Sequence, residues 1–463
     1  MNELYEEKIN RSNFRKVSYL PIVLVVCYLI FTLILYTYGP FAWITYNPIM
    51  FYTLQIFYIA FLTLGYMIGI RSQNGRFTDW KKKEKNICRW ILPFTAINCI
   101  VILINIARDM GHISFDISAI ISEMLRGMKD MGAGYNERYD RIMSALNGGM
   151  VLGGTLMTLI NYLWDFFSFN VLLLGIYYFK KEGIVTKILV LISALETVCF
   201  YVSIGTNIGV FRVILAIVLF LILAIIRKNC MCVGKRKRKH AKVTIALIGG
   251  STIILVIYYF FNTMKARGGI YFWDTEYYNV GGIGLNRDSI FLKLLPTSLY
   301  MPLISLSSYL TQGYYGFSLA TTIPWKPMYG VGSSKALVDI ITEHFTDIER
   351  FTYQYRIQEK FGWDRDVQWA SMYTWTANDV GIYGTVIVMF FLGYFLAMSY
   401  KDSIVSENPF SALVVVYFGL TCIFLPCNFQ IFQSTYTLFG FISVFLIWIL
   451  STRFGPMSRF STS

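Results

Sequence analysis

The stretch VSYLPIVLVVCYLIFTLILYTYG, which covers Val17–Gly39, contains no charged residue. A helix needs about 20 apolar residues to cross roughly 30 Å of hydrocarbon, so this stretch is long enough to span a bilayer. The preceding segment, MNELYEEKINRSNFRK, is polar, and the apolar run is longer than the apolar region of a signal peptide. We therefore expect a permanent first transmembrane span.

The rest of the chain repeats this pattern. Of the 463 residues, 56% are hydrophobic and 15% are charged, whereas soluble domains carry about 25% charged residues. Lipid-facing surface accounts for the excess of apolar residues. The apolar runs predict an all-α integral membrane protein with about ten transmembrane helices. The expected spans are Val17–Gly39, Asn47–Ile70, Trp90–Arg108, Val151–Phe179, Ile184–Ser203, Gly209–Ile226, Val243–Phe261, Gly381–Tyr400, Phe410–Pro426 and Phe429–Leu450.

The connections between the spans predict the orientation. Arg71–Arg89 and Arg227–Lys242 are dense in lysine and arginine, and Lys180 and Lys181 lie in a third, short connection. Alternation of the spans puts all three on one face, which the positive-inside rule makes cytoplasmic, together with both termini. These loops explain the net charge of +14 better than nucleic-acid binding does. Arg227–Lys242 either sets the topology or contacts anionic lipid or a partner.

Three regions follow from this topology. Residues 1–261 form a seven-span membrane domain with an outer loop at 109–150, residues 262–380 form a large outer loop, and residues 381–463 form a three-span domain. The large loop contains the apolar stretch Ile290–Thr322, which prolines and glycines interrupt. A straight span there would break the topology, so we expect helices that lie at the interface or dip into the bilayer.

The motifs of soluble enzymes are missing from the sequence. It has no Walker A motif, no dinucleotide fingerprint, no HExxH and no DxD pair that would hold a nucleotide sugar through a cation. The eight cysteines all lie outside the two long outer loops, which argues against a disulfide framework. We therefore predict no metal and no cofactor.

Arginines on the predicted outer face are candidates for binding phosphate, because the guanidinium donates parallel hydrogen bonds to an oxyanion. Arg212 lies about one turn inside the sixth span, where a charge is costly and is a functional candidate. A structural pair with Glu196 on the preceding span is the alternative. Arg267 follows the seventh span beside two glycines, where it either binds an anion or anchors lipid headgroups.

The large loop adds charged and aromatic candidates. Arg287 and Arg365 are further arginines, which a surface or structural role would equally explain. The possible general bases are Glu343, His344, Asp366 and Asp379. In WASMYTWTANDVGIYG (Trp369–Gly384), aromatic rings alternate with polar groups, as sugar recognition requires; an interfacial aromatic belt is the alternative. The candidates for sugar contacts are Trp369, Trp375, Asn378 and Asp379, with Tyr314 and Tyr315 as a second pair.

The layout and three segments resemble the Wzy-type repeat-unit polymerases of bacterial O-antigen and capsule. The segments are SIGTNIGVFR (Ser203–Arg212), SYLTQGYYGFSLA (Ser308–Ala320) and WASMYTWTANDVGIYG. Some members carry an arginine followed by ten residues and a glycine in each outer loop. Arg138 and Gly149 match this signature in the first loop, whereas the second loop has no such pair. The match makes Arg138 a candidate for substrate binding.

The resemblance implies a fold of the GT-C-like membrane glycosyltransferase class in the bacterial inner membrane. It implies transfer of a growing glycan from undecaprenyl pyrophosphate to a new lipid-linked repeat unit. A flippase and a chain-length regulator are the partners it implies. On this scheme Arg212, Arg267 and Arg365 stabilise the departing pyrophosphate, without a metal. An O-antigen ligase and a lipid-linked oligosaccharide transporter remain the alternatives.

Overall fold

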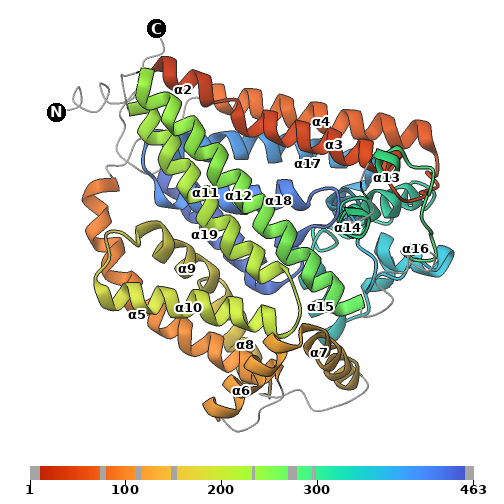
Figure 1. Ribbon diagram of the computed structural model, residues 1–463, viewed down its shortest axis with the longest axis horizontal. Helices are drawn as coiled ribbons and strands as arrows, with labels where there is room; N and C mark the ends of the chain where they lie inside the picture. The colour runs from red at the N-terminus through yellow and green to blue at the C-terminus, as the bar shows by residue number, and fades with distance from the viewer. Residues whose placement is uncertain are drawn as a thin grey trace.

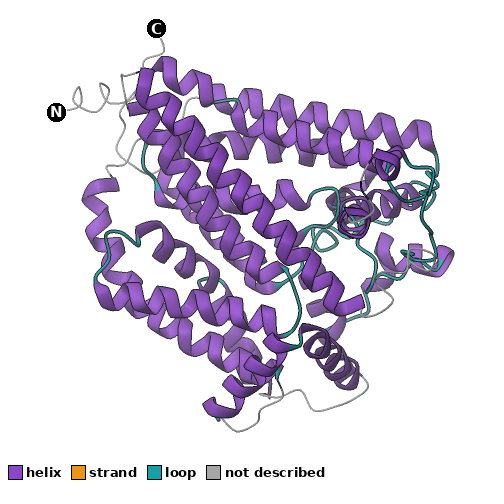
Figure 2. Cartoon of the chain, in the orientation of Figure 1, coloured by secondary structure: helices purple, strands orange, loops and turns teal. Residues whose placement is uncertain are grey.

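The computed structural model describes residues 11–72, 80–110, 116–146, 154–231, 235–268, 279–294, 296 and 299–453. Within these residues the regular structure is helical (Figure 2). Extended backbone pairs only at two isolated bridges in the described part, between Phe41 and Leu285 and between Val280 and Ile283. The fold is therefore all-α, as the sequence predicts.

Nine helices in the described part are long and apolar enough to cross a membrane, which is the composition of a multi-pass membrane protein. The elements that build these spans are α2 (Arg11–Val17), α3 (Leu20–Tyr38), α4 (Pro48–Arg71), α5 (Trp80–Asp109), α8 (Gly154–Asp165), α9 (Ser168–Tyr178), α10 (Ile184–Ser203), α11 (Ile208–Met231), α12 (Lys235–Gly268), α17 (Met372–Val405) and α19 (Thr435–Arg453). The ninth predicted span, Phe410–Pro426, corresponds to α18 (Pro409–Phe424), an apolar helix of 16 residues.

One predicted span and one long helix are interrupted. The predicted span Val151–Phe179 consists of α8 and α9, which are separate helices. Helix α17 is broken at Gly381, whose φ of 73° and ψ of 166° are not helical. This break coincides with the residue at which the sequence predicts the eighth span to begin. The nine residues Met372–Val380 therefore form a distinct helical segment ahead of the membrane-crossing part.

The helix ends that the sequence assigns to one face lie together. The Tyr66 hydroxyl donates to the Ser18 carbonyl at 2.6 Å, Asn408 donates to the Ser451 hydroxyl at 3.0 Å, and Arg227 pairs with Glu407. We call this the basic end of the bundle. Helices α13 to α16, together with α7, lie toward the opposite end (Figure 1), which we call the loop end. This grouping agrees with the alternation expected from the sequence.

Helices α4 and α17 pack in close contact through glycines. An added Cβ at Gly65 would collide with the Phe390 carbonyl oxygen, and one at Gly393 would collide with the Leu62 carbonyl oxygen. Gly69, four residues after Gly65, approaches the Tyr394 carbonyl in the same way. Small residues at this spacing let the backbones of membrane helices approach one another. The α4–α17 pair is thus joined by backbone-to-backbone contact.

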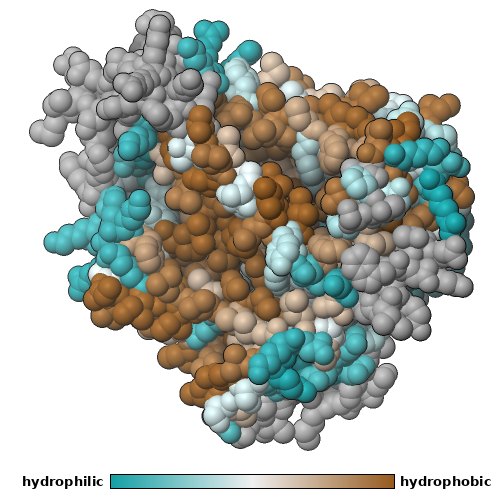
Figure 3. Space-filling model, in the orientation of Figure 1, coloured by the Kyte–Doolittle hydropathy of each residue, from teal (hydrophilic) through white to brown (hydrophobic). Residues whose placement is uncertain are grey.

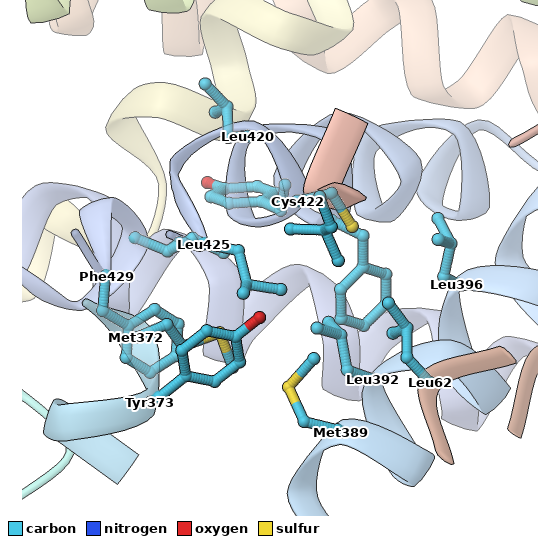
Figure 4. Close-up of a cluster of buried hydrophobic side chains, with 14 of the residues drawn as sticks. Leu62, Met372, Tyr373, Met389, Leu392, Leu396, Leu420, Cys422, Leu425 and Phe429 are labelled. Carbon is cyan, nitrogen blue, oxygen red and sulfur yellow. The ribbon is translucent and has the colours of Figure 1, made fainter. Parts of the chain in front are cut away.

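The main core lies between α17, α18 and the helices around them. Figure 4 shows Leu62, Met389, Leu392 and Leu425 meeting in this cluster, which buries each of them to at least 94% of its surface. Large apolar side chains also remain exposed on the outer faces of the spans, and the space-filling view shows broad hydrophobic areas (Figure 3). Contiguous exposed apolar surface of this kind is expected where a protein faces lipid.

The large loop folds into helices that pack on the bundle. They are α13 (Ile290–Leu294), α14 (Tyr300–Ala320), α15 (Lys335–His344) and α16 (Tyr353–Phe361). Helix α14 contacts α3, α12, α16 and α17, and Figure 1 shows it nearly end on while α3 and α4 run across the view. An added Cβ at Gly313 would collide with the Pro426 carbonyl, which explains a glycine in this buried helix. The apolar stretch Ile290–Thr322 thus supplies a transverse helix at the loop end.

Candidate functional site

Arg212 is placed by the tight connection between α10 and α11. Helix α10 ends in a Schellman motif, in which the Thr206 N–H donates to the Tyr201 carbonyl at 2.9 Å and Gly205 has a φ of +59°. A side chain at Gly205 would also collide with the Met131 carbonyl oxygen. This connection starts α11 at Ile208, so Arg212 lies in its second turn, close to the loop end.

The Arg212 side chain is buried without a protein partner. It is 5% exposed, and among the residues that the structure describes no carboxylate pairs with it and no acceptor takes its hydrogen bonds. The alternative role for Arg212, an ion pair with Glu196, is not formed between these two described residues. Among the described residues, Glu196 Oε2 is buried and has no hydrogen-bond partner. Burying an unpaired charge costs several kcal/mol, so an anion that binds here would gain a preformed cation.

Two tyrosines lie within electrostatic reach of Arg212. The Arg212 charge acts electrostatically on the hydroxyls of Tyr417 and Tyr436, from α18 and α19. Asp165 acts on the same Tyr436 hydroxyl, and it accepts a hydrogen bond from Thr435 at 2.5 Å, which joins α8 to α19. Near the loop end, the Tyr436 hydroxyl is thus under the influence of both the Arg212 cation and the Asp165 carboxylate.

Sequence reasoning did not select Tyr417 or Tyr436. Tyr417 is a single polar group in a long apolar run, Tyr436 lies in the polar stretch QSTYT, and neither belongs to a recognisable motif. The signal that could have identified them is the presence of hydroxyls on the last two predicted spans. Their proximity to Arg212 depends on how α18 packs against α11 and α19 against α18, which is a long-range property.

Arg267 lies in the last turn of α12, and its side chain lies outside what the structure describes. The Phe211 and Tyr259 rings are in contact, with centroids 6.3 Å apart, so Tyr259 marks the level of Arg212 on α12. Arg267 follows Tyr259 by about two helical turns, roughly 12 Å further along the helix. The two arginine backbones thus lie on neighbouring helices at different depths. A joint role in phosphate binding stays a prediction.

The Arg365 side chain interacts with other side chains of the large loop. Its Nε lies 3.0 Å from Glu349 Oε1, and its guanidinium carbon lies 4.7 Å from the centre of the Tyr355 ring. Burial raises the pKa of Glu349, and the nearby Arg365 charge opposes that shift. The Asp366 side chain is 66% exposed and lies 3.8 Å from Arg365. Arg365 therefore stabilises the fold of the large loop, and the structure shows no contact between it and Arg212.

Asn378 and Asp379 hold the large loop to the start of α17. Asn378 is fully buried and donates to the Gly332 carbonyl at 2.8 Å, while its side-chain oxygen accepts the Tyr353 N–H at 2.7 Å. The Asp379 carboxylate accepts the N–H groups of Gly330, Gly332 and Ser333 at 2.7–2.9 Å. These contacts use the polar groups that the sequence assigns to sugar binding.

Replacing Asp379 tests this structural role. We expect Asp379→Ala to release the segment that contains Gly330 and Ser333, because each hydrogen bond to a charged acceptor contributes about 1.5–3 kcal/mol. The measurement is the thermal unfolding midpoint of the purified protein, with limited proteolysis at that segment. Glu359→Ala, which removes an exposed acid on α16, is the matched control. Equal midpoints and cleavage patterns for the two variants would contradict the role.

The aromatic candidates divide into packed and half-buried groups. Tyr314 is 1% exposed and its hydroxyl lies 3.1 Å from Thr32 Oγ1, while Tyr315 is 8% exposed and stacks on Trp43. Trp375 is also buried. Trp369 is half-buried, and its backbone N–H donates to Gln312 at 3.2 Å. The structure therefore uses most of these rings for packing, and Trp369 is the one that keeps substantial exposure.

The remaining arginine candidates lie apart from these groups. Arg138 on α7 (Met131–Leu146) pairs with Asp109 at 3.2 Å. Nearby, α6 (Ile117–Lys129), α7 and the end of α10 enclose a cavity of about 230 Å³. Gly149, the partner of Arg138 in the sequence signature, lies outside the described residues. Arg287 is exposed in the loop before α13.

No group of three or more histidine, cysteine, aspartate or glutamate side chains that could hold a metal ion occurs in the described ranges. Comparison with known proteins adds no identity: no family model, no curated protein and no solved structure matches the chain.

Proposed function

We propose that this chain is a membrane glycosyltransferase that polymerises oligosaccharide repeat units carried on undecaprenyl pyrophosphate. The observation that carries the proposal is the buried Arg212, which has no ion-pair partner among the described residues and lies near the loop end of a multi-pass bundle. A guanidinium there suits a lipid-linked diphosphate, because the phosphates of such a lipid lie at the membrane surface while its chain stays in the hydrocarbon. The resemblance of three segments to the Wzy-type polymerases supports the same assignment.

The proposed reaction needs charge stabilisation at the leaving group. A hydroxyl oxygen of the acceptor repeat unit forms a bond to the anomeric carbon of the donor glycan, and the bond from that carbon to the pyrophosphate oxygen breaks. Undecaprenyl pyrophosphate leaves with the bonding electron pair, and a carboxylate takes the hydroxyl proton. Arg212 stabilises the negative charge that develops on the pyrophosphate. Asp165, which acts on the same Tyr436 hydroxyl as Arg212 does, is the candidate for this carboxylate.

This assignment requires movement of the helices. Because Arg212 is only 5% exposed, a phosphate reaches it when the helices packed around α11 separate at the loop end. The loop end faces away from the cytoplasm in this proposal, and the lipid tails enter sideways between spans. The basic end, where Arg227 begins the basic run Arg227–Lys242, lies in the cytoplasm by the positive-inside rule.

The glycans of a deletion strain test the proposal. Loss of a polymerase leaves a single repeat unit on the final acceptor, whereas loss of a ligase or a flippase leaves none. We expect a gel of surface glycans from the deletion strain to show one repeat unit, and the wild-type gene to restore the ladder. An acceptor without any repeat unit would favour the ligase or transporter alternatives.

A chelator is expected to leave polymerisation by the purified enzyme unchanged. The pyrophosphate already activates the sugar, and arginine supplies the positive charge that a divalent cation supplies in many phosphate-transfer sites. The measurement is polymer length after incubation with lipid-linked repeat units, with and without EDTA. Loss of polymer with EDTA, restored by Mg²⁺, would contradict the metal-free scheme.

A further inference from the structure

A groove of about 500 Å³ lies at the basic end, between the first turns of α5 and the facing parts of α18 and α19. Its α5 wall is formed by Trp80, Lys83, Ile87 and Trp90. These residues are spaced by three or four positions, so they lie on one face of the helix. From Trp80 to Trp90 the helix rises roughly 15 Å, about half of a 30 Å hydrocarbon layer. The groove therefore extends along α5 over about the thickness of one leaflet.

The charged residue that lines the groove, Lys83, lies near its mouth, beside the Trp80 and Phe410 rings. Lys83 and Ser451 line the part nearest the basic end, where α5 begins and α19 ends. Trp90 and Ile447 line the deeper part, and Trp90 is 62% exposed. This order matches a phospholipid, whose charged headgroup lies at the surface and whose acyl chain extends inward.

The charge at the mouth of the groove is positive and can pair with an anionic headgroup. The Lys83 ammonium lies 5.5 Å from the centre of the Trp80 ring, and no carboxylate pairs with it among the described residues. The neighbouring acid, Glu84, is taken by Lys181 at 2.6 Å. Arg89 is exposed one to two turns further along α5. The local balance at the mouth therefore favours an anionic headgroup.

We propose that this groove binds an anionic phospholipid of the leaflet at the basic end, with one acyl chain between α5 and α19 and the phosphate against Lys83. Beyond the contact between the Trp80 and Phe410 rings, the lipid would fill the space between α5 and α19 and so join α5 more firmly to the α18–α19 pair. The proposal does not rest on the proposed function, because it concerns lipid binding alone.

Native mass spectrometry of the delipidated full-length protein tests the site. The probes are phosphatidylglycerol and phosphatidylcholine with identical acyl chains, added at equal concentration. We expect the wild type to retain phosphatidylglycerol in preference, and Lys83→Ala to reduce that retention about fivefold, as expected for one lysine at an anionic surface. Lys85→Ala is the matched control, because Lys85 is exposed on the opposite face of the same helix. Leu450→Trp, which fills the groove, should remove the retained lipid.

Four outcomes would overturn the proposal. Equal losses in the Lys83 and Lys85 variants would mean diffuse attraction to the basic helix. Equal retention of the two lipids by the wild type would mean an apolar site without headgroup recognition. Displacement of phosphatidylglycerol by an equal concentration of a polyprenyl phosphate would assign the groove to that lipid. A dimer that Leu450→Trp converts to monomer would assign it to a second copy of the chain.

Discussion

Arg212→Ala is expected to abolish long polymer while leaving the protein folded in the membrane. Removing one preorganised donor to a developing negative charge typically costs 10²–10³-fold in rate, and about that loss is expected here. Stability should be unchanged or higher, because the variant removes a buried charge that has no ion-pair partner in the described part of the chain. The measurements are the glycan ladder of a complemented deletion strain, the membrane level of the protein and its unfolding midpoint.

Two further variants make this result specific. Arg212→Lys should also lose most activity, since a single ammonium does not reproduce the two-pronged donor geometry of a guanidinium. Arg350→Ala removes an exposed arginine of the large loop that stacks on Phe351, and should leave the ladder intact. A normal ladder with Arg212→Ala would remove the phosphate assignment. Loss of the folded protein with Arg212→Ala would instead make the guanidinium a structural group.

Gly393→Leu is expected to prevent stable assembly of the bundle. The α4 backbone lies against this position, so the new side chain would collide with the Leu62 carbonyl and force α4 and α17 apart. Overpacking of a well-packed interior costs about 1–3 kcal/mol, and contact with a backbone, which cannot rotate away, belongs at or above the top of that range. The measurements are the membrane level of the protein and its elution profile after mild detergent extraction.

The matched control is Gly250→Leu. Gly250 also lies in a span, on α12, but an added Cβ there would meet nothing within 4 Å. This variant should therefore be made at the wild-type level. If Gly393→Leu and Gly250→Leu behaved alike, the close approach of α4 and α17 would not be a determinant of assembly. Gly65→Leu, on the opposite helix of the same contact, should reproduce the loss.

The candidate site was only partly accessible from the sequence. Arg212 could be selected, because a charge inside an apolar run is costly wherever the run folds. Asn378 and Asp379 were assigned to sugar on composition, whereas their polar groups bind the backbone of the segment near Gly332. Amide and carboxylate groups bind backbone and sugar hydroxyls through the same hydrogen bonds, so composition does not distinguish these roles.

The sequence by itself determined the helical class, the number of apolar runs and the grouping of the basic loops. These properties depend on the transfer of local segments into hydrocarbon and on backbone hydrogen bonds that close within each helix. The tertiary structure alone decided that Arg212 has no ion-pair partner among the described residues, that Tyr436 lies beside it and that Tyr314 is buried. Those outcomes depend on the register between helices distant in sequence, such as the Tyr28 hydroxyl bonded to the Ile423 carbonyl at 2.6 Å. The helix propensity and hydropathy of each segment do not determine that register.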